Sequence, residues 1–254
     1  MSIIYAVNLT QILLSIGLIV SSSELILLHK EFKKGGILNL SLTKSYRLND
    51  GNYINRFYAK HLIKFKIVVF SIIARLVLGI ILLFTIYYHL ISSVILFFIF
   101  LMSLLINFSM AFGKDGSDQM LLIVTFGLLI VQFALHINHF TLANIALWFV
   151  ALQCILSYFT AGVAKLFGKT WRNGFALREV TSTKTYGNRL AKKILGNDKT
   201  AIFLNWSVVA FELAFPLVLI LKAPLIYILL GVALSFHIGI AYVMGLNTFI
   251  WAFG

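Results

Sequence analysis

"ISSVILFFIFLMSLLINFSM", residues 91–110, is a run of twenty residues without a single charged side chain. A helix of this length is about 30 Å long, which matches the hydrocarbon thickness of a bilayer. Similar apolar runs recur along the whole chain. Their length and frequency predict a protein that crosses a membrane several times as helices.

The composition supports the same class. Of the 254 residues 61% are hydrophobic and only 11% are charged, and the mean hydropathy is +0.98. A soluble domain of this size needs a polar surface that so few polar residues cannot provide. We therefore predict an all-α fold: a polytopic helical membrane bundle with seven or eight transmembrane helices, formed as a single domain by residues 1–254.

The limits of the spans follow from the apolar runs. The predicted spans are 3–28, 67–89, 90–112, 119–135, 140–166, 204–221 and 224–245. The run "LNTFIWAFG", residues 246–254, is a further half-span or full span. Pro216 lies inside the sixth span and is expected to kink it, because proline cannot donate the backbone hydrogen bond of a helix.

The net charge of +13 is concentrated in two loops, residues 29–66 with nine Lys and Arg and residues 167–203 with eight. Basic loops between apolar spans are typical of topology determinants that contact anionic lipid, so we do not expect nucleic-acid binding. The predicted spans place both loops on one side, which the positive-inside rule makes cytoplasmic in a bacterial inner membrane. Both mix basic and apolar residues, which favours interfacial segments along lipid; docking of a peptide or a partner subunit is the alternative.

Charged or titratable residues within apolar spans are candidates for function, because such groups are costly at membrane depth and tend to pair or to face a cavity. They are Glu24, Arg75, Asp118, Lys165, Glu212 and His237. We expect the three carboxylates to pair with the arginine, the lysine and the histidine. Ion pairs that only hold helices in register are the alternative.

Lys165 is the most informative of these residues. Tyr158, Ala161, Gly162 and Lys165 share one helical face at spacings i, i+3, i+4 and i+7. The small pair permits close approach of another helix, which would turn the amine into the bundle, where desolvation favours its use as a base. The alternative is a boundary lysine that extends to the lipid headgroups.

Several kinds of chemistry lack support. His136 and His139 have a spacing that can suit a metal, but no acidic third ligand is near in sequence, so we predict no metal site. Cys154 is the sole cysteine, which excludes an intrachain disulfide. The motifs of nucleotide-binding proteins and of common hydrolases do not occur.

Three stretches resemble the horizontally transferred transmembrane domain (HTTM) family, which includes the vitamin K-dependent gamma-carboxylases. They are "YFTAGVAKLFGKTWRNGFAL" at 158–177, "FELAFPLVLIL" at 211–221 and "SFHIGIAYVMGLNTF" at 235–249. In that family the lysine of Tyr-x-x-Ala-Gly-x-x-Lys-Leu abstracts a proton from reduced vitamin K, and Lys165 matches it. The resemblance implies a cavity between the fourth to seventh spans, with reduced vitamin K or another quinone as cofactor.

From the intramembrane polar residues and the match at Lys165 we predict Lys165, His237, Glu212 and Asp118 as catalytic residues, and Gln119, Tyr158 and Trp171 as cofactor-binding residues. The lysine would act as base or charge stabiliser, the carboxylates would tune it, and the histidine would relay protons. Gln119 stands where the carboxylases have a histidine, which is a departure from their pattern.

"KDGSDQMLLIVTFGLL", residues 114–129, is closer to the bacterial branch of the family typified by sporulation-delaying protein B. That branch helps to mature a secreted peptide toxin together with a partner protein, and carries arginine at the lysine position. The resemblance thus implies maturation or modification of a secreted peptide, with a partner maturation protein. The alternatives are a non-catalytic membrane partner for peptide export, recognition or immunity, and a true vitamin K-dependent carboxylase/epoxidase homologue.

Overall fold

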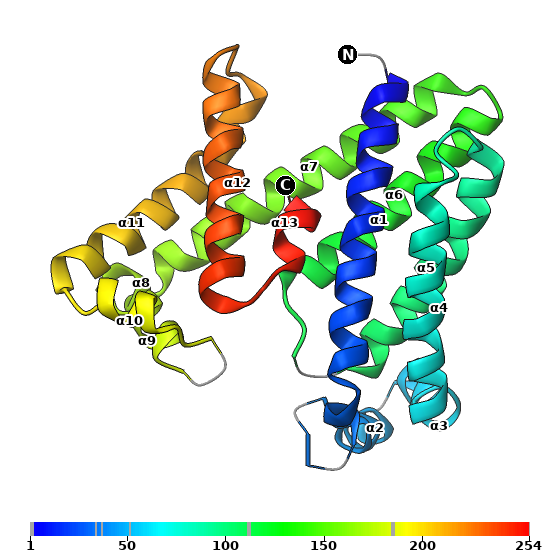
Figure 1. Ribbon diagram of the computed structural model, residues 1–254, viewed down its shortest axis with the longest axis horizontal. Coiled ribbons are helices and arrows are strands. Elements are labelled where there is room, and N and C mark those ends of the chain that lie inside the picture. Colours follow the sequence, from blue (N-terminus) through cyan, green and yellow to red (C-terminus); the bar gives the residue numbers. More distant parts are fainter. Residues whose placement is uncertain are drawn as a thin grey trace. The chain divides into compact units, whose positions relative to one another are not determined.

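A computed structural model describes residues 3–33, 35–36, 38–50, 52–110, 113–183 and 186–253. The regular structure of these residues is helical throughout, without a strand (Figure 1). Within them, seven helical segments are long and apolar enough to cross a membrane: Ile3–Leu27, Phe65–Leu83, His89–Ser109, Gly116–His136, Phe140–Phe167, Asp198–Leu219 and Leu225–Met244. The prediction of an all-α, multi-pass membrane protein is confirmed.

The chain packs as two compact units, one up to Val150 and one from Ala151 on. Each unit has its own set of helices and is described by itself below. The single domain expected from the sequence stays a prediction.

The first unit is a ring of four long helices, α1 (Ile3–Leu27), α4 (Phe65–Leu83), α5 (His89–Ser109) and α6 (Gly116–His136). α1 packs on α4, α4 on α5, α5 on α6, and α6 returns to α1 (Figure 1). Leucine and isoleucine side chains fill the middle of this ring. The outward faces expose large apolar side chains, which suits a surface covered by hydrocarbon.

The first basic loop is folded rather than extended. It forms η1 (His29–Phe32), α2 (Leu40–Asn49) and α3 (Tyr53–His61) at one end of the four-helix ring (Figure 1). The side chains of Asn39 and Asn52 start α2 and α3 by accepting hydrogen bonds from the backbone N–H groups of Ser41 and Ile54, each at 2.9 Å. Apolar residues of the loop share a core with α4 and α5. Contact of its outer face with lipid stays a prediction.

The second unit holds the end of α7 (Phe140–Phe167) and the elements that follow. They are α8 (Lys169–Arg172), α9 (Ala176–Ser182), α10 (Arg189–Ile194), α11 (Asp198–Ala214), η2 (Phe215–Leu219), α12 (Leu225–Met244) and α13 (Thr248–Phe253). α8 and α9 pack on α11, α10 packs on α9, and α13 packs on α12 (Figure 1). The second basic loop is therefore a set of short helices built onto the start of α11.

Two span limits differ from the sequence prediction by six residues. The second span ends at Leu83, before the turn at 84–88, and the sixth begins at Asp198, because the Asn197 side chain caps α11 there. At Pro216 the expected irregularity takes the form of a change from α-helix to the 3₁₀-helix η2. Residues 248–253 form only the six-residue α13, about 9 Å long and too short to cross a bilayer.

Candidate functional site

Lys165 forms an ion pair with Glu212 inside the second unit. Its Nζ lies 2.7 Å from both Oε1 and Oε2 of the carboxylate. The Lys165 side chain is 21% exposed and that of Glu212 only 5%. The carboxylate partner expected for the lysine is thus present, and the amine is held between α7 and α11 rather than extended away from the protein.

The ring of Trp171 covers the amine from another side. The Nζ of Lys165 lies 5.1 Å from the ring centroid, a distance that permits a cation–π interaction of about 0.5–2 kcal/mol. Trp171 belongs to α8, which starts directly after α7 ends. Trp171, named from the sequence as a cofactor-binding residue, thus lies next to the amine of Lys165.

Gly162 allows the two helices to approach at the ion pair. A Cβ atom at this position would lie 2.9 Å from the backbone N of Leu213 and 3.0 Å from Cβ of Glu212. The missing side chain lets α7 rest directly on the backbone of α11, one turn before Lys165. The small-residue contact predicted from the sequence is confirmed.

We expect Gly162→Ala to lower the free energy of unfolding by about 1–3 kcal/mol, because the added methyl group meets backbone that cannot turn aside. Gly231→Ala is the matched control, since a Cβ there meets nothing within 4 Å. Unfolding titrations in mixed detergent micelles measure both. Equal stability of the two variants would contradict the close packing at Gly162.

Tyr158 and His237 form a second polar contact. The hydroxyl of Tyr158 is hydrogen-bonded to Nε2 of His237, and both residues are almost fully buried. Phe215 stacks on the tyrosine ring at 3.9 Å, and Phe253 stacks on the imidazole at 5.3 Å, between ring centroids. The Nδ1 atom of His237 has no hydrogen-bond partner in the described part of the chain. The two residues form a polar dyad within an aromatic enclosure.

The dyad and the ion pair lie on the same face of α7. Tyr158 and Lys165 are two helical turns apart, about 10 Å along the axis. The Glu212 carboxylate interacts electrostatically with Tyr158, and the ring of the neighbouring Phe211 lies 5.6 Å from that of Tyr158. Four of the residues singled out in the sequence thus gather between α7, α11 and α12.

Tyr158→Phe is expected to lower the free energy of unfolding by about 1–2 kcal/mol, because Nε2 of His237 is then buried without a partner. The ring packing is conserved in this variant, so the effect reports on the hydroxyl alone. The same unfolding titration applies, with the double variant Tyr158→Phe/His237→Phe as control. A Tyr158→Phe variant as stable as the wild type would show that the hydrogen bond contributes nothing.

Asp118 and Gln119 belong to the first unit. The Asp118 carboxylate accepts a hydrogen bond from the backbone of Asp115, whose own side chain accepts one from the backbone of Asp118, and this reciprocal capping box starts α6. Gln119 follows on the first turn of α6 and is exposed. A role for these two residues beside Lys165 stays a prediction.

Arg75 is nearly buried in the first unit, at 3% exposure. Its guanidinium donates to the hydroxyls of Ser22 and Ser21 on α1, at 2.9 and 3.0 Å. Asp118 is a carboxylate that acts on it electrostatically. The hydrogen bonds of Arg75 join α4 to α1, which fits the structural alternative for this intramembrane charge.

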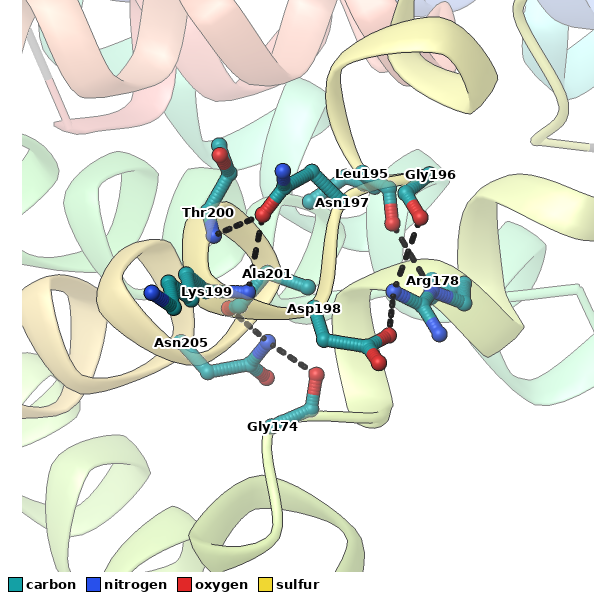
Figure 2. A network of polar contacts seen from close by, with 10 residues as sticks. All are labelled: Gly174, Arg178, Leu195, Gly196, Asn197, Asp198, Lys199, Thr200, Ala201 and Asn205. Carbon is teal, nitrogen blue, oxygen red and sulfur yellow. Dashed lines mark hydrogen bonds and ion pairs between the residues drawn. The ribbon is translucent and has the colours of Figure 1, made fainter.

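A network that the sequence reasoning missed fastens the segment after Trp171 to α11 (Figure 2). Asn205 is fully buried and donates to the carbonyls of Gly174 and Ala201, at 2.9 and 2.7 Å. Its side-chain oxygen accepts from the backbone N–H of Leu177 at 3.3 Å. Gly174 has φ +79°, and a Cβ there would lie 2.8 Å from Cα of Ile202, so this turn requires glycine. The sequence signal that could have revealed this network is Asn205 itself, a polar residue within an apolar helical run.

Arg178 completes the network (Figure 2). Its guanidinium donates to the carbonyls of Leu195 and Gly196, at 2.7 and 3.4 Å, and to Oδ1 of Asp198 at 2.6 Å. The arginine therefore binds the end of α10 and the start of α11 at once. The contacts of Asn205 and Arg178 together hold the second basic loop against α11. They thereby also fix Trp171, which lies over the amine of Lys165.

Asn205→Leu is expected to lower the free energy of unfolding by about 1–3 kcal/mol, because the Gly174 carbonyl loses its donor while a side chain of the same branched shape remains. The segment 169–177 should then be cleaved faster by proteases, and the emission of Trp171 should shift in a variant that has this tryptophan alone. Unchanged cleavage and emission would contradict the proposed fastening of the loop.

Of the two histidines with metal-like spacing, His139 has another role in the structure. Nδ1 of His139 accepts a hydrogen bond from the backbone N–H of Leu142 at 3.1 Å and so caps the start of α7. His136 is exposed at the end of α6. Among the described residues, no three His, Cys, Asp or Glu side chains gather in a way that could hold a metal ion.

No family model, curated protein or solved structure matches the chain. The resemblance to the HTTM family thus stays a prediction from the quoted sequence stretches. What the structure supports by itself is a multi-pass membrane protein with a paired lysine and a buried Tyr–His dyad in its second unit.

Proposed function

We propose that this protein is an HTTM-like membrane enzyme, or enzyme subunit, that matures or modifies a secreted peptide with Lys165 as its proton-accepting group. The observation that carries the proposal is the amine of Lys165 held 2.7 Å from both oxygens of Glu212. The positive-inside rule supports a place in a bacterial inner membrane with both basic loops in the cytoplasm.

The pair has the chemistry that a base needs. Burial removes water from both charges, which brings the neutral pair of amine and carboxylic acid closer in free energy to the ionic pair. A proton that moves along one N–H···O contact passes from Nζ of Lys165 to Glu212. The free amine then accepts an acidic proton from a substrate, and Glu212 keeps the first proton until the cycle ends.

Tyr158 and His237 offer a second proton donor and acceptor on the same face of α7, two helical turns from Lys165. Phenol and imidazole each donate and accept hydrogen bonds, so a proton can move between the tyrosine oxygen and Nε2 of the histidine. In the proposed cycle His237 relays protons through this contact.

A quinone-type cofactor fits the residues around the dyad. The buried, unpartnered Nδ1 of His237 suits the oxygen of such a ring, and the phenylalanine rings suit its flat faces. Tyr158 and His237 would hold it, with Trp171 near the amine. Reduced vitamin K or another reduced quinone supplies an acidic hydroxyl, the kind of proton that Lys165 can accept.

The second candidate is a non-catalytic membrane partner for export, recognition or immunity to the same kind of peptide. The observation that favours it is the complete pairing of Lys165, which also explains the residue as a link between α7 and α11. Proton chemistry is then unnecessary. The two candidates differ in whether the peptide changes chemically.

The deciding experiment compares the intact masses, amounts and locations of the secreted peptides of the producing cells, with and without the protein. A mass change that depends on the protein is the expected result. A change in the amount or location of the peptide without a change in mass would support the non-catalytic partner. No difference in mass, amount or location would overturn the role in peptide maturation.

A further inference from the structure

A groove opens on the outer face of the first unit. It lies between α5 and α6, has a volume of about 360 Å³, and is lined mainly by Leu90, Val94, Phe97, Leu129, Ile130 and Phe133. All of these residues belong to two of the candidate membrane spans. In a bilayer the groove therefore opens to hydrocarbon, and its volume lies in the range of small-molecule sites.

A buried chain of polar side chains ends at His89, the residue before Leu90 of the groove lining. Gln11 donates from Nε2 to the carbonyl of Leu82 at 2.9 Å, and its Oε1 accepts from Nε2 of Gln132. Oε1 of Gln132 in turn contacts Nδ1 of His89 at 2.7 Å. Both glutamines are fully buried, and His89 directly precedes Leu90 of the groove lining.

The direction of these hydrogen bonds determines that Nδ1 of His89 is a donor. A backbone carbonyl can only accept, so the amide of Gln11 has to present its nitrogen to Leu82. Its oxygen then faces the nitrogen of Gln132, and the oxygen of Gln132 faces the imidazole. Nδ1 of His89 must therefore carry a hydrogen, which leaves Nε2 available to a partner outside this chain of bonds.

The end of the first unit that contains residues 84–89 and 136–140 has side chains typical of the level of lipid headgroups. Tyr87 and Tyr88, just before α5, are 77% and 59% exposed, as in the aromatic belts at membrane interfaces. His136 lies one turn beyond Gln132 on α6, and His139 follows in the next turn. Residues 84–89 and 136–140 contain three histidines and no Asp or Glu. In these two segments imidazole groups are therefore present and no carboxylate side chain is there to repel an anion.

We propose that His89 and the groove between α5 and α6 bind a phospholipid with an anionic headgroup. One acyl chain lies in the groove between Val94 and Phe133. In the bound state Nε2 of His89 donates to a phosphate oxygen at the level of the two tyrosines, while Nδ1 continues to donate to Gln132. The interaction is independent of the Lys165 chemistry, since all of its residues lie in the first unit.

The test uses the full-length protein in vesicles of dioleoyl phosphatidylglycerol and dioleoyl phosphatidylethanolamine in equal amounts, followed by detergent extraction and native mass spectrometry. The wild type is expected to retain one phospholipid and to prefer the anionic one about tenfold, the effect of one charge-assisted hydrogen bond. Retention without headgroup preference, or no retained lipid, would overturn the proposal.

Three variants separate the parts of the site. His89→Asn keeps a donor for Gln132 in place of Nδ1 and removes Nε2, so it should retain lipid without preference. Val94→Phe fills the groove and should lose the lipid of either kind. Leu101→Phe adds the same ring at an exposed position of α5 outside the groove lining and should behave as the wild type. If Val94→Phe still retains lipid, the lipid does not lie in the groove. If the wild type forms a dimer and only Val94→Phe loses it, the groove binds a second copy of the protein rather than an acyl chain.

Discussion

Glu212→Ala is expected to destabilise the protein by about 3–5 kcal/mol in the free energy of unfolding, the cost of leaving a buried charge without its partner. The carboxylate is only 5% exposed and both of its oxygens contact the amine of Lys165. Without this carboxylate, the ammonium group of Lys165 keeps the contact with the Trp171 ring but has lost its counter-charge. Unfolding titrations in mixed micelles measure the loss.

The double variant Lys165→Met/Glu212→Leu should recover most of that stability. Replacing a buried ion pair with apolar groups of similar volume is often neutral or stabilising, because neither charge then has to be desolvated. The two results together distinguish a true buried pair from two surface groups. A Glu212→Ala variant as stable as the wild type would show that the lysine finds water or lipid headgroups and that the pair is not buried.

Lys165→Arg is expected to fold as the wild type and to lose the modification of the peptide by a factor of about 10²–10⁴, the contribution of a general base. A guanidinium can pair with Glu212 through two hydrogen bonds and can lie over the Trp171 ring, so the structural contacts are kept. It does not release its proton, so it cannot serve as a base. The measurement is the rate of peptide modification at equal abundance of the two proteins in the membrane.

This variant also separates the two chemical roles considered for the lysine. If the amine only stabilises charge, arginine should perform as well as lysine, because both are cations that can pair with Glu212. The matched control is Lys165→Met/Glu212→Leu, which is folded but has neither a charge nor a base at the site. Activity in that control would exclude both roles.

The sequence predicted the features that depend on local pattern. Apolar run length located the spans, and the spacing of Gly162 and Lys165 predicted a close helix contact next to a paired amine, which the structure contains. Span limits were less predictable because side-chain caps decide them. Asn197 adds the first turns of α11, where the apolar pattern alone begins only at residue 204.

What the sequence did not predict are contacts between residues far apart in the chain. Gln11 and Gln132 meet only because α6 closes the ring onto α1. Asn205 reaches Gly174 because the second basic loop folds back onto α11. A polar residue in an apolar helix is costly to bury, so the sequence shows that it needs a partner. Which residue that partner is depends on the topology of the helices, and local periodicity does not reveal it.

The central claim is that a sequestered, proton-accepting amine at Lys165 acts on a secreted peptide. The intact mass of that peptide, compared between cells with the wild type and cells with Lys165→Arg at equal membrane abundance, tests it most directly. We predict a mass change with the wild type and the unmodified precursor mass with the variant. The full mass change in cells that contain only the arginine variant would contradict the claim, because no releasable proton would then be needed at this position.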